Sequence, residues 1–291
     1  MSYVEQIEEL AKTIKKFIDM DLYATRKRVR PPTQAFSDFL TNREQGDWAE
    51  ELMLKILNKN LNDFIAVSYG RKDRIIAGDK EFKEFFEKYQ DELDSIGKCP
   101  DILIFKKDDI SKEELRDMQS KPRKDIIDIT KKAIAGLEVR SSAFLVKKYA
   151  EFIKGRTDAK KRNFLSFTPK IEDLSTIFKW IKVHEVPHFY VQVLFDSIYV
   201  ISFEKILTLL SDKKNLKTKY FIEKNSKNQF KSTIHINLNE GFCISQDVQL
   251  PEHKSEVKEL SRGRLLFYVK FATKELPKHI DEKSILQALN L

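Results

Sequence analysis

The sequence predicts a mixed α/β fold, with a central sheet of mixed strand direction flanked by helices. Apolar residues recur every three to four positions in several segments, which is the helical period. Other apolar runs are short and nearly unbroken, such as Ile102–Phe105, and fit strands buried on both faces. Glycine and proline number only eight each in 291 residues, so we expect one compact unit without long linkers.

The helical period places helices in nine segments. They are expected over residues 3–20, 42–57, 82–93, 111–119, 125–135, 145–153, 171–183, 205–210 and 282–289.

Strands are expected where apolar and β-branched residues cluster between turn residues. They cover residues 64–69, 100–105, 136–142, 163–168, 188–196, 198–203, 233–238, 241–250 and 265–271. Two of them meet at Asp196-Ser197, which predicts a tight turn and an antiparallel pair.

The charge and the cysteine count narrow the class of partner. The net charge is +8, which favours a polyanion such as nucleic acid, because lysine and arginine laid against phosphate release bound counterions. Cys99 and Cys243 are too few for a zinc site or a disulfide framework. The N-terminus does not have the pattern of a signal peptide, and no run approaches the roughly 18 apolar residues of a membrane span. We therefore expect a cytoplasmic location.

Two acids and a cation fall on neighbouring predicted strands. Asp101 follows Pro100 at the head of one buried strand, and Glu138 lies inside another, 37 residues later. Arg140 is two residues further on, so it shares a strand face with Glu138. A charged glutamate in an apolar strand is costly unless it is paired or binds a metal. Carboxylates from adjacent strands, with a cation beside them, suit Mg²⁺-assisted phosphodiester hydrolysis.

A further acid comes from the predicted helix 42–57. Glu50 lies four residues after Gly46, so both lie on one face of that helix. This geometry allows Glu50 to lean over the strand ends as an accessory metal ligand.

Each residue also has a simpler interpretation. Asp101 could cap a turn, and Glu138 could pair with Arg140 at a sheet edge. Arginine cannot lose its proton at neutral pH, so Arg140 could only clamp a phosphate. Two possibilities are therefore open: Arg140 acts alone, or Lys147 or Lys148 of the following predicted helix assists it.

The order Gly-x-x-x-Glu, Pro-Asp and Glu-x-Arg resembles the signature of PD-(D/E)XK nucleases, with arginine at the usual lysine position. Longer strings resemble the AccI-type family of type II restriction endonucleases over roughly residues 25–210. These strings are Arg30-Pro-Pro-Thr33, Leu40-Thr-Asn-Arg-Glu-Gln-Gly-Asp-Trp-Ala-Glu50, Leu137-Glu-Val-Arg-Ser-Ser142 and Val186-Pro-His-Phe-Tyr-Val-Gln-Val193.

The resemblance implies a PD-(D/E)XK core that makes sequence-specific double-strand cuts in DNA with Mg²⁺, usually as a homodimer. It also implies a cognate DNA methyltransferase in the same system, without direct binding between the two proteins. By matching position, Asp101, Glu138 and Glu50 would be metal ligands, and Arg140 would stand at the lysine position. We expect a single nuclease domain over 1–291, with a helical and basic N-terminal arm (1–41), a catalytic core (42–210) and a β-rich C-terminal subdomain (211–291). The alternatives are a repair or structure-specific nuclease on the same core and a DNA-binding module whose site is inactive, which the arginine at position 140 would favour.

Several residues are candidates for DNA contact because clustered cations and hydroxyls suit phosphate. The alternatives are a solvated loop for the basic stretch and for Lys170, and a helix N-cap for one of the serines. The candidates are Arg26, Lys27, Arg28, Arg30, Ser141, Ser142 and Lys170.

Overall fold

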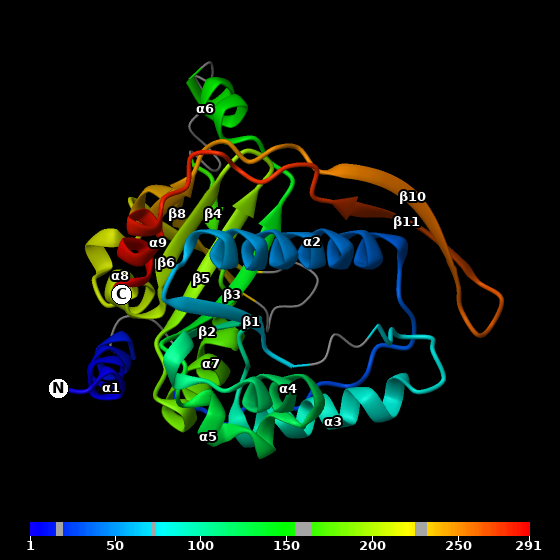
Figure 1. Ribbon diagram of the computed structural model, residues 1–291, viewed down its shortest axis with the longest axis horizontal. Helices are drawn as coiled ribbons and strands as arrows, with labels where there is room; N and C mark the ends of the chain where they lie inside the picture. Colours follow the sequence, from blue (N-terminus) through cyan, green and yellow to red (C-terminus); the bar gives the residue numbers. More distant parts are fainter. Residues whose placement is uncertain (16–19, 71–73, 155–163, 225–231) are drawn as a thin grey trace.

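The computed structural model describes residues 1–15, 20–70, 74–154, 164–224 and 232–291. Within them, a six-stranded sheet in the order β1-β2-β3-β5-β6-β9 lies at the centre (Figure 1). Strands β3 and β5 are parallel and the other neighbours are antiparallel, so the mixed sheet is confirmed. The bounds are β1 Phe64–Ser68, β2 Ile102–Lys106, β3 Ala135–Ser142, β5 His188–Leu194, β6 Ile198–Ser202 and β9 Phe242–Ser245.

Helices cover both faces of this sheet (Figure 1). Helix α2 packs on one face, and α1, α7 and α8 pack on the other. None of the helices in the described ranges is long and apolar enough to span a membrane. The helices are α1 Tyr3–Ile14, α2 Ser37–Asn60, α3 Phe82–Ile96, α4 Lys112–Ser120, α5 Ile127–Thr130, α6 Val146–Lys154, α7 Ile171–His184, α8 Phe203–Leu210 and α9 Glu282–Leu289.

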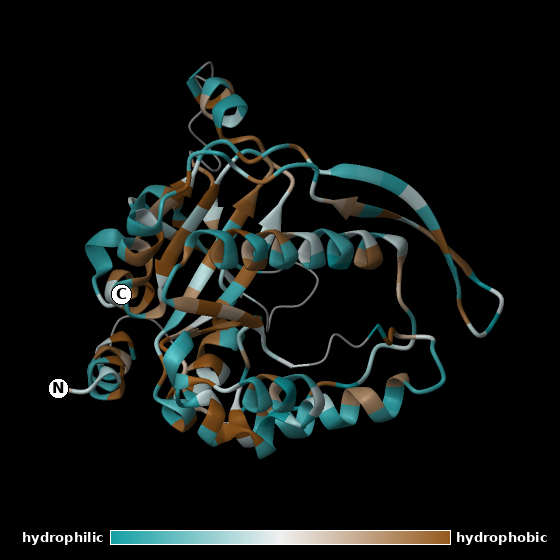
Figure 2. Cartoon of the chain, in the orientation of Figure 1, coloured by the Kyte–Doolittle hydropathy of each residue, from teal (hydrophilic) through white to brown (hydrophobic). Residues whose placement is uncertain are grey.

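Each face of the central sheet has its own hydrophobic core, and strand β2 contributes side chains to both. Ile102 and Ile104 pack on the α2 side, whereas Leu103 and Phe105 pack on the α7 side, and all four are fully buried. Alternate residues of a strand point to opposite faces, so an unbroken apolar run is required here. Figure 2 shows the same distribution, with apolar residues on the central strands and polar residues on the outer helix faces.

Two smaller sheets are built mostly by the C-terminal segment, with β4 added from the core segment. One has the order β4-β8-β7, with β4 Ser166–Phe167, β7 Tyr220–Lys224 and β8 Ser232–Asn237. The other is a hairpin of β10 Glu252–Glu259 and β11 Leu265–Ala272, which extends away from the central sheet beyond α2 (Figure 1). Because β9 joins the central sheet, the segment 211–291 contributes to the main core as well.

Some predicted boundaries differ from the structure. The helix expected over 125–135 is wrong: α5 ends at Thr130, and the Ile134 N–H already bonds to the carbonyl of Ile104 in β2 (2.8 Å). Strands β7 and β10 were not predicted. Residues 16–19 of the first expected helix and Asn163 of an expected strand lie outside the described residues.

Gly97 ends α3 and directs the chain toward the head of β2. Its φ of +82° lies in the left-handed region, which favours glycine. A Cβ at this position would approach the backbone nitrogen of Trp180 in α7 to 2.5 Å. The next residue, Lys98, donates its N–H to the carbonyl of Thr176 in α7 (2.9 Å). Gly97 therefore fixes where the segment leading to Asp101 lies against α7.

Replacing Gly97 by alanine should lower the free energy of unfolding by about 1–3 kcal/mol, because a Cβ overlaps the backbone of α7. Chemical denaturation measures this change. Gly263→Ala is the matched control: its φ is +75°, but no atom lies within 4 Å of the added Cβ. It should cost only about 1 kcal/mol for the left-handed conformation. Equal losses in the two variants would contradict the steric explanation.

Candidate active site

Asp101 immediately precedes β2, and β3 extends beyond the start of β2 at this point. Its N–H donates to the carbonyl of Leu137 (2.8 Å), and its own carbonyl accepts from the N–H of Tyr69 (2.9 Å). Its Oδ2 accepts from the N–H of Val139 (2.7 Å). Pairing between β2 and β3 stops at Ile102–Leu137, so the Asp101 carboxylate lies where the two strands part.

Glu138 and Arg140 point to the same face of β3, as their spacing predicted. The guanidinium Nη2 of Arg140 lies 2.6 Å from Oε1 of Glu138. Glu138 is only 3 % exposed, so its charge requires such a partner. A second cation contacts the same oxygen: the ammonium group of Lys98 lies 2.7 Å from Oε1. Of the lysines considered beside Arg140, Lys147 and Lys148 are exposed on α6. The lysine that contacts Glu138 is instead Lys98.

Asp173, in the first turn of α7, completes a ring of charges. Its Oδ2 lies 2.8 Å from Nζ of Lys98 and 3.4 Å from Nη2 of Arg140. Each cation therefore bridges the same two carboxylate oxygens, Oε1 of Glu138 and Oδ2 of Asp173. We call these four residues the ion quartet; its formal charges sum to zero.

The ion quartet governs the protonation of its members. Burial alone would raise the pKa of Glu138, but Lys98 and Arg140 outweigh burial and hold this pKa below its usual value. Burial also opposes the charge on Lys98, yet Glu138 and Asp173 keep the pKa of Lys98 above its usual value. All four side chains are therefore charged near neutral pH.

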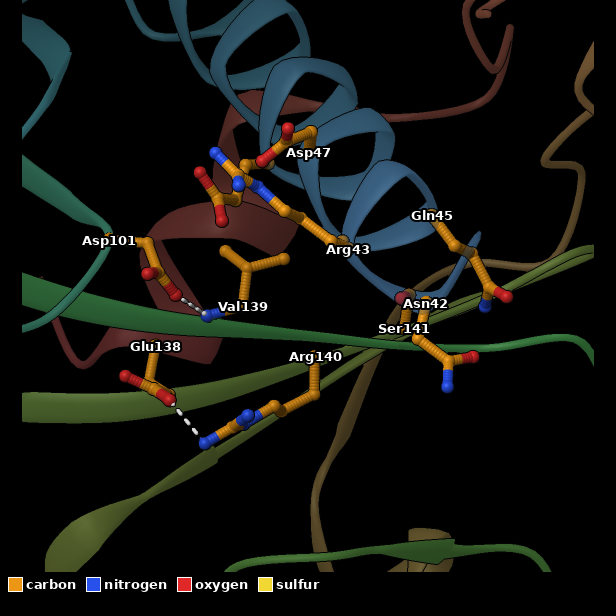
Figure 3. A pocket seen from close by; sticks show the side chains of 11 residues that line it. Asn42, Arg43, Gln45, Asp47, Asp101, Glu138, Val139, Arg140 and Ser141 are labelled. Atoms are coloured by element: carbon orange, nitrogen blue, oxygen red, sulfur yellow. Dashed lines mark hydrogen bonds and ion pairs between the residues drawn. The ribbon is translucent and has the colours of Figure 1, made fainter. Parts of the chain in front are cut away.

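Helix α2 and the end of β3 enclose a pocket of about 380 Å³. Glu50 and Gly46 of α2 line it, together with Asp101, Glu138 and Arg140. Figure 3 shows Asp101 and Val139 on the α2 side of the β3 ribbon, with Glu138 and Arg140 on the opposite side. The remaining lining residues are Asn42, Arg43, Gln45, Asp47, Val139 and Ser141.

The charges around the pocket favour a cation. Burial, the Glu138 carboxylate and the Glu50 carboxylate, in that order, raise the pKa of Asp101 well above its usual value. In the described part of the chain, however, no three or more His, Cys, Asp or Glu side chains stand together as a finished metal cluster. Glu138 is turned toward Lys98 and Arg140, on the side of β3 away from α2 (Figure 3).

Sequence reasoning missed Lys98 and Asp173. Lys98 lies three residues before Asp101, so the Pro-Asp motif could have drawn attention to it. Asp173 had no such signal, since an acid in the first turn of a helix is common and favourable in itself.

The basic arm is partly tied to the protein itself. Arg26 donates to Gln90 Oε1 (2.7 Å) and pairs with Asp94 (3.0 Å), and Arg28 pairs with Asp94 and Asp91 (both 2.6 Å). These contacts anchor the arm to α3. Lys27 and Arg30 are exposed.

The remaining candidates for DNA contact lie at the ends of β3 and α7. Ser141 lines the pocket, and Ser142 follows it in β3. Neither serine caps α6, because the carboxylate of Asp196 accepts from the N–H groups of Val146 (3.0 Å) and Lys147 (3.4 Å). The capping alternative is therefore wrong. Lys170 is exposed at the N-cap position of α7.

The raised pKa of Asp101 predicts that Asp101→Asn stabilises the protein in EDTA. The folded state holds the proton more tightly than the unfolded state, whose carboxyl titrates near pH ~4. Stability of the native sequence therefore falls as pH rises through the pKa of folded Asp101. Asparagine keeps an acceptor for Val139 but carries no charge. We expect its melting temperature at about pH 8 to be a few degrees higher.

Asp109→Asn, at an exposed position, is the matched control and should leave the melting temperature unchanged. A lower melting temperature for Asp101→Asn at this pH would show that charge repulsion at Asp101 is not the dominant effect.

Comparison with known proteins identifies the chain. The family model described as AccI restriction endonuclease matches residues 1–160 and 157–291, and so accounts for the whole sequence. No curated protein and no solved structure gives a significant match. The chain belongs to the AccI restriction endonuclease family and is a type II restriction endonuclease, a site-specific deoxyribonuclease that cleaves DNA.

Proposed function

We propose that this restriction endonuclease cuts DNA at the pocket lined by Asp101, Glu138 and Glu50, and that its central sheet is a PD-(D/E)XK core. The element order α2, β1, β2, β3, α7, β5 supports this proposal, with one acid at the head of β2 and another inside β3. The observation that carries it is that Asp101 and Glu138, from adjacent strands, line the same pocket.

We further propose Mg²⁺ as the metal, with Asp101, Glu138 and Glu50 as its ligands. Hard cations prefer carboxylate oxygens, and three buried or half-buried acids around one pocket are the donor set that such an ion requires. The raised pKa of Asp101 supports this, because a cation would relieve the repulsion that now favours the proton. When bound, the ion would polarise the phosphate and favour deprotonation of the attacking water.

Arg140 is proposed to stabilise the negative charge of the scissile phosphate. It cannot act as a base, because a guanidinium stays protonated. Its Nη2 is engaged in the ion quartet, but its side chain is one-third exposed and lines the pocket. Its Nε is buried without a hydrogen-bond partner among the described residues. Arg140 is therefore held at the pocket with hydrogen-bonding capacity to spare.

The proposed DNA contacts flank this pocket. Lys27 and Arg30 are exposed, and we propose that both contact phosphate while Arg26 and Arg28 hold the arm against α3. On the core, the proposed contacts are Ser141, Ser142 and Lys170, because hydroxyl and ammonium groups are common phosphate ligands.

The proposed assembly is a homodimer. A two-fold axis would place two identical pockets on the two strands of a palindromic site, so each copy cuts one strand. The proposed biological partner is a DNA methyltransferase of the same specificity, which would protect the host's own sites.

The proposal is tested by incubating the protein with unmethylated phage DNA in Mg²⁺ and in EDTA. We expect discrete bands in Mg²⁺ alone. Glu138→Gln should reduce the cleavage rate by more than about 100-fold, because a proposed metal ligand loses its charge. Binding to the same DNA, measured by gel shift in EDTA, should remain.

The matched control is Glu114→Gln, an acid on α4 that pairs with Lys132 outside the pocket. It should cleave at the native rate. Native-rate cleavage by Glu138→Gln would remove Glu138 from the site, and cleavage in EDTA would overturn the requirement for metal.

The arm can be tested through the salt dependence of DNA binding. Each phosphate contact contributes about 0.9 to the slope of log K against log salt concentration. Lys27→Ala and Arg30→Ala should each reduce this slope by about 1. Lys88→Ala is the control, because Lys88 is an exposed lysine that pairs with Glu84 on α3. An unchanged slope in both arm variants would place the arm away from DNA.

A further inference from the structure

One lysine in the active site comes from outside the strand that carries Glu138. Lys98 precedes β2, in the segment that also carries Asp101, and lies 2.7 Å from Glu138 Oε1. Strand position 140, two residues after Glu138, is an arginine. We propose that Lys98 and Asp173 are positioning residues of the cleavage site, with Lys98 supplying the lysine beside Glu138 from another segment. This inference rests on the proposed function.

The contacts of the ion quartet support a role in orientation. Both ion pairs of Glu138 end on the same oxygen, Oε1. Two cations from different segments therefore fix this oxygen from two directions. Glu138 also lines the pocket, so the orientation of its carboxylate bears on any cation held there. Lys98 and Arg140 thus determine how Glu138 presents its carboxylate.

Asp173 is needed because two cations meet at one carboxylate. Without it, Glu138, Lys98 and Arg140 would carry a net positive charge in a region where the side chain of Lys98 is only 15 % exposed and that of Glu138 only 4 %. Asp173 contacts both cations and returns the net charge to zero. It also gives the Lys98 ammonium group a second carboxylate partner, at 2.8 Å, beside Glu138 at 2.7 Å.

Stability is a weak explanation for such an arrangement. Buried ion pairs often contribute no more to stability than apolar residues of similar volume, because desolvation offsets the attraction. The ion quartet joins the lead-in to β2, strand β3 and the start of α7 at the proposed metal ligands. Its location therefore favours a role in the geometry of the site.

Electrostatics gives the two positioning residues opposite effects on a cation in the pocket. Lys98→Met removes a positive charge next to Glu138, so a divalent cation should bind more tightly. Asp173→Asn removes a negative charge, so the same cation should bind more weakly. A purely structural role would loosen the site in both variants and weaken the cation in both.

The test measures Mn²⁺ binding to the full-length protein without DNA, from the electron paramagnetic resonance signal of the free ion. We expect roughly a three- to tenfold lower Kd for Lys98→Met and a similarly higher Kd for Asp173→Asn. Single-turnover cleavage of DNA in Mg²⁺ should slow by about 10–100-fold in Lys98→Met, because Glu138 loses one of its two restraints. Lys98→Arg keeps the charge and should recover most of both properties.

Lys88→Met is the matched control, because Lys88 is a 74 % exposed lysine paired with Glu84. It should leave Mn²⁺ affinity and cleavage unchanged. If circular dichroism shows that Lys98→Met does not fold, Lys98→Gln, which also removes the charge, takes its place. Tighter Mn²⁺ binding in Lys98→Gln with weaker binding in Asp173→Asn supports the inference, and any other combination overturns it.

Two results would overturn the inference when Lys98→Met folds: native cleavage in that variant, or Mn²⁺ affinities that move in the same direction in Lys98→Met and Asp173→Asn. These outcomes differ from failure of the proposed function. If Glu138→Gln abolishes cleavage and Lys98→Met does not, only the positioning role is lost. If Glu138→Gln cleaves normally, the assignment of the site itself is lost.

Discussion

A carboxylate in the middle of a buried strand has to be neutralised, and much of the site in this protein follows from that requirement at Glu138. Desolvation of an isolated carboxylate costs far more than a single hydrogen bond returns. Arg140 supplies one positive charge from the same strand, and Lys98 supplies another from the lead-in to β2. Two cations in turn require Asp173, which brings the start of α7 into the same cluster.

The same requirement connects the site to the fold. Lys98 can reach Glu138 because Gly97 turns the chain sharply after α3 and lets it lie against α7. Three residues later the segment presents Asp101 where β2 and β3 part. One short connection therefore delivers both a proposed metal ligand and the cation that restrains a second ligand. Helix α2 brings Glu50 from the opposite side of β3.

The sequence predicted the central sheet well because its strands are buried on both faces. Such strands read as nearly unbroken apolar runs, and β2, β3, β5 and β6 all lie close to their expected bounds. Strand β10 was missed because Glu252–Glu259 is mostly charged and its strand conformation comes from pairing with β11. The helix expected over 125–135 failed for a similar reason, since pairing of Ile134 with β2 prevailed over the helical period.

The site could be predicted only where its residues follow one another in a recognisable order. Glu50, Asp101, Glu138 and Arg140 do so, and the structure brings all four to one pocket. Lys98 meets Glu138 across 40 residues, Asp173 meets Arg140 across 33, and Lys98 meets Asp173 across 75. These partners depend on how the segments pack. No local pattern records such a contact.

The ion quartet also bears on how this site could change during evolution. Once a lysine reaches the glutamate from a neighbouring segment, the strand position two residues after the glutamate no longer has to be a lysine. Descendants could then carry arginine at that position, as this chain does at position 140. A search pattern written along one strand would discard such descendants as degenerate copies. A pattern that pairs position 98 with position 138 would recover them.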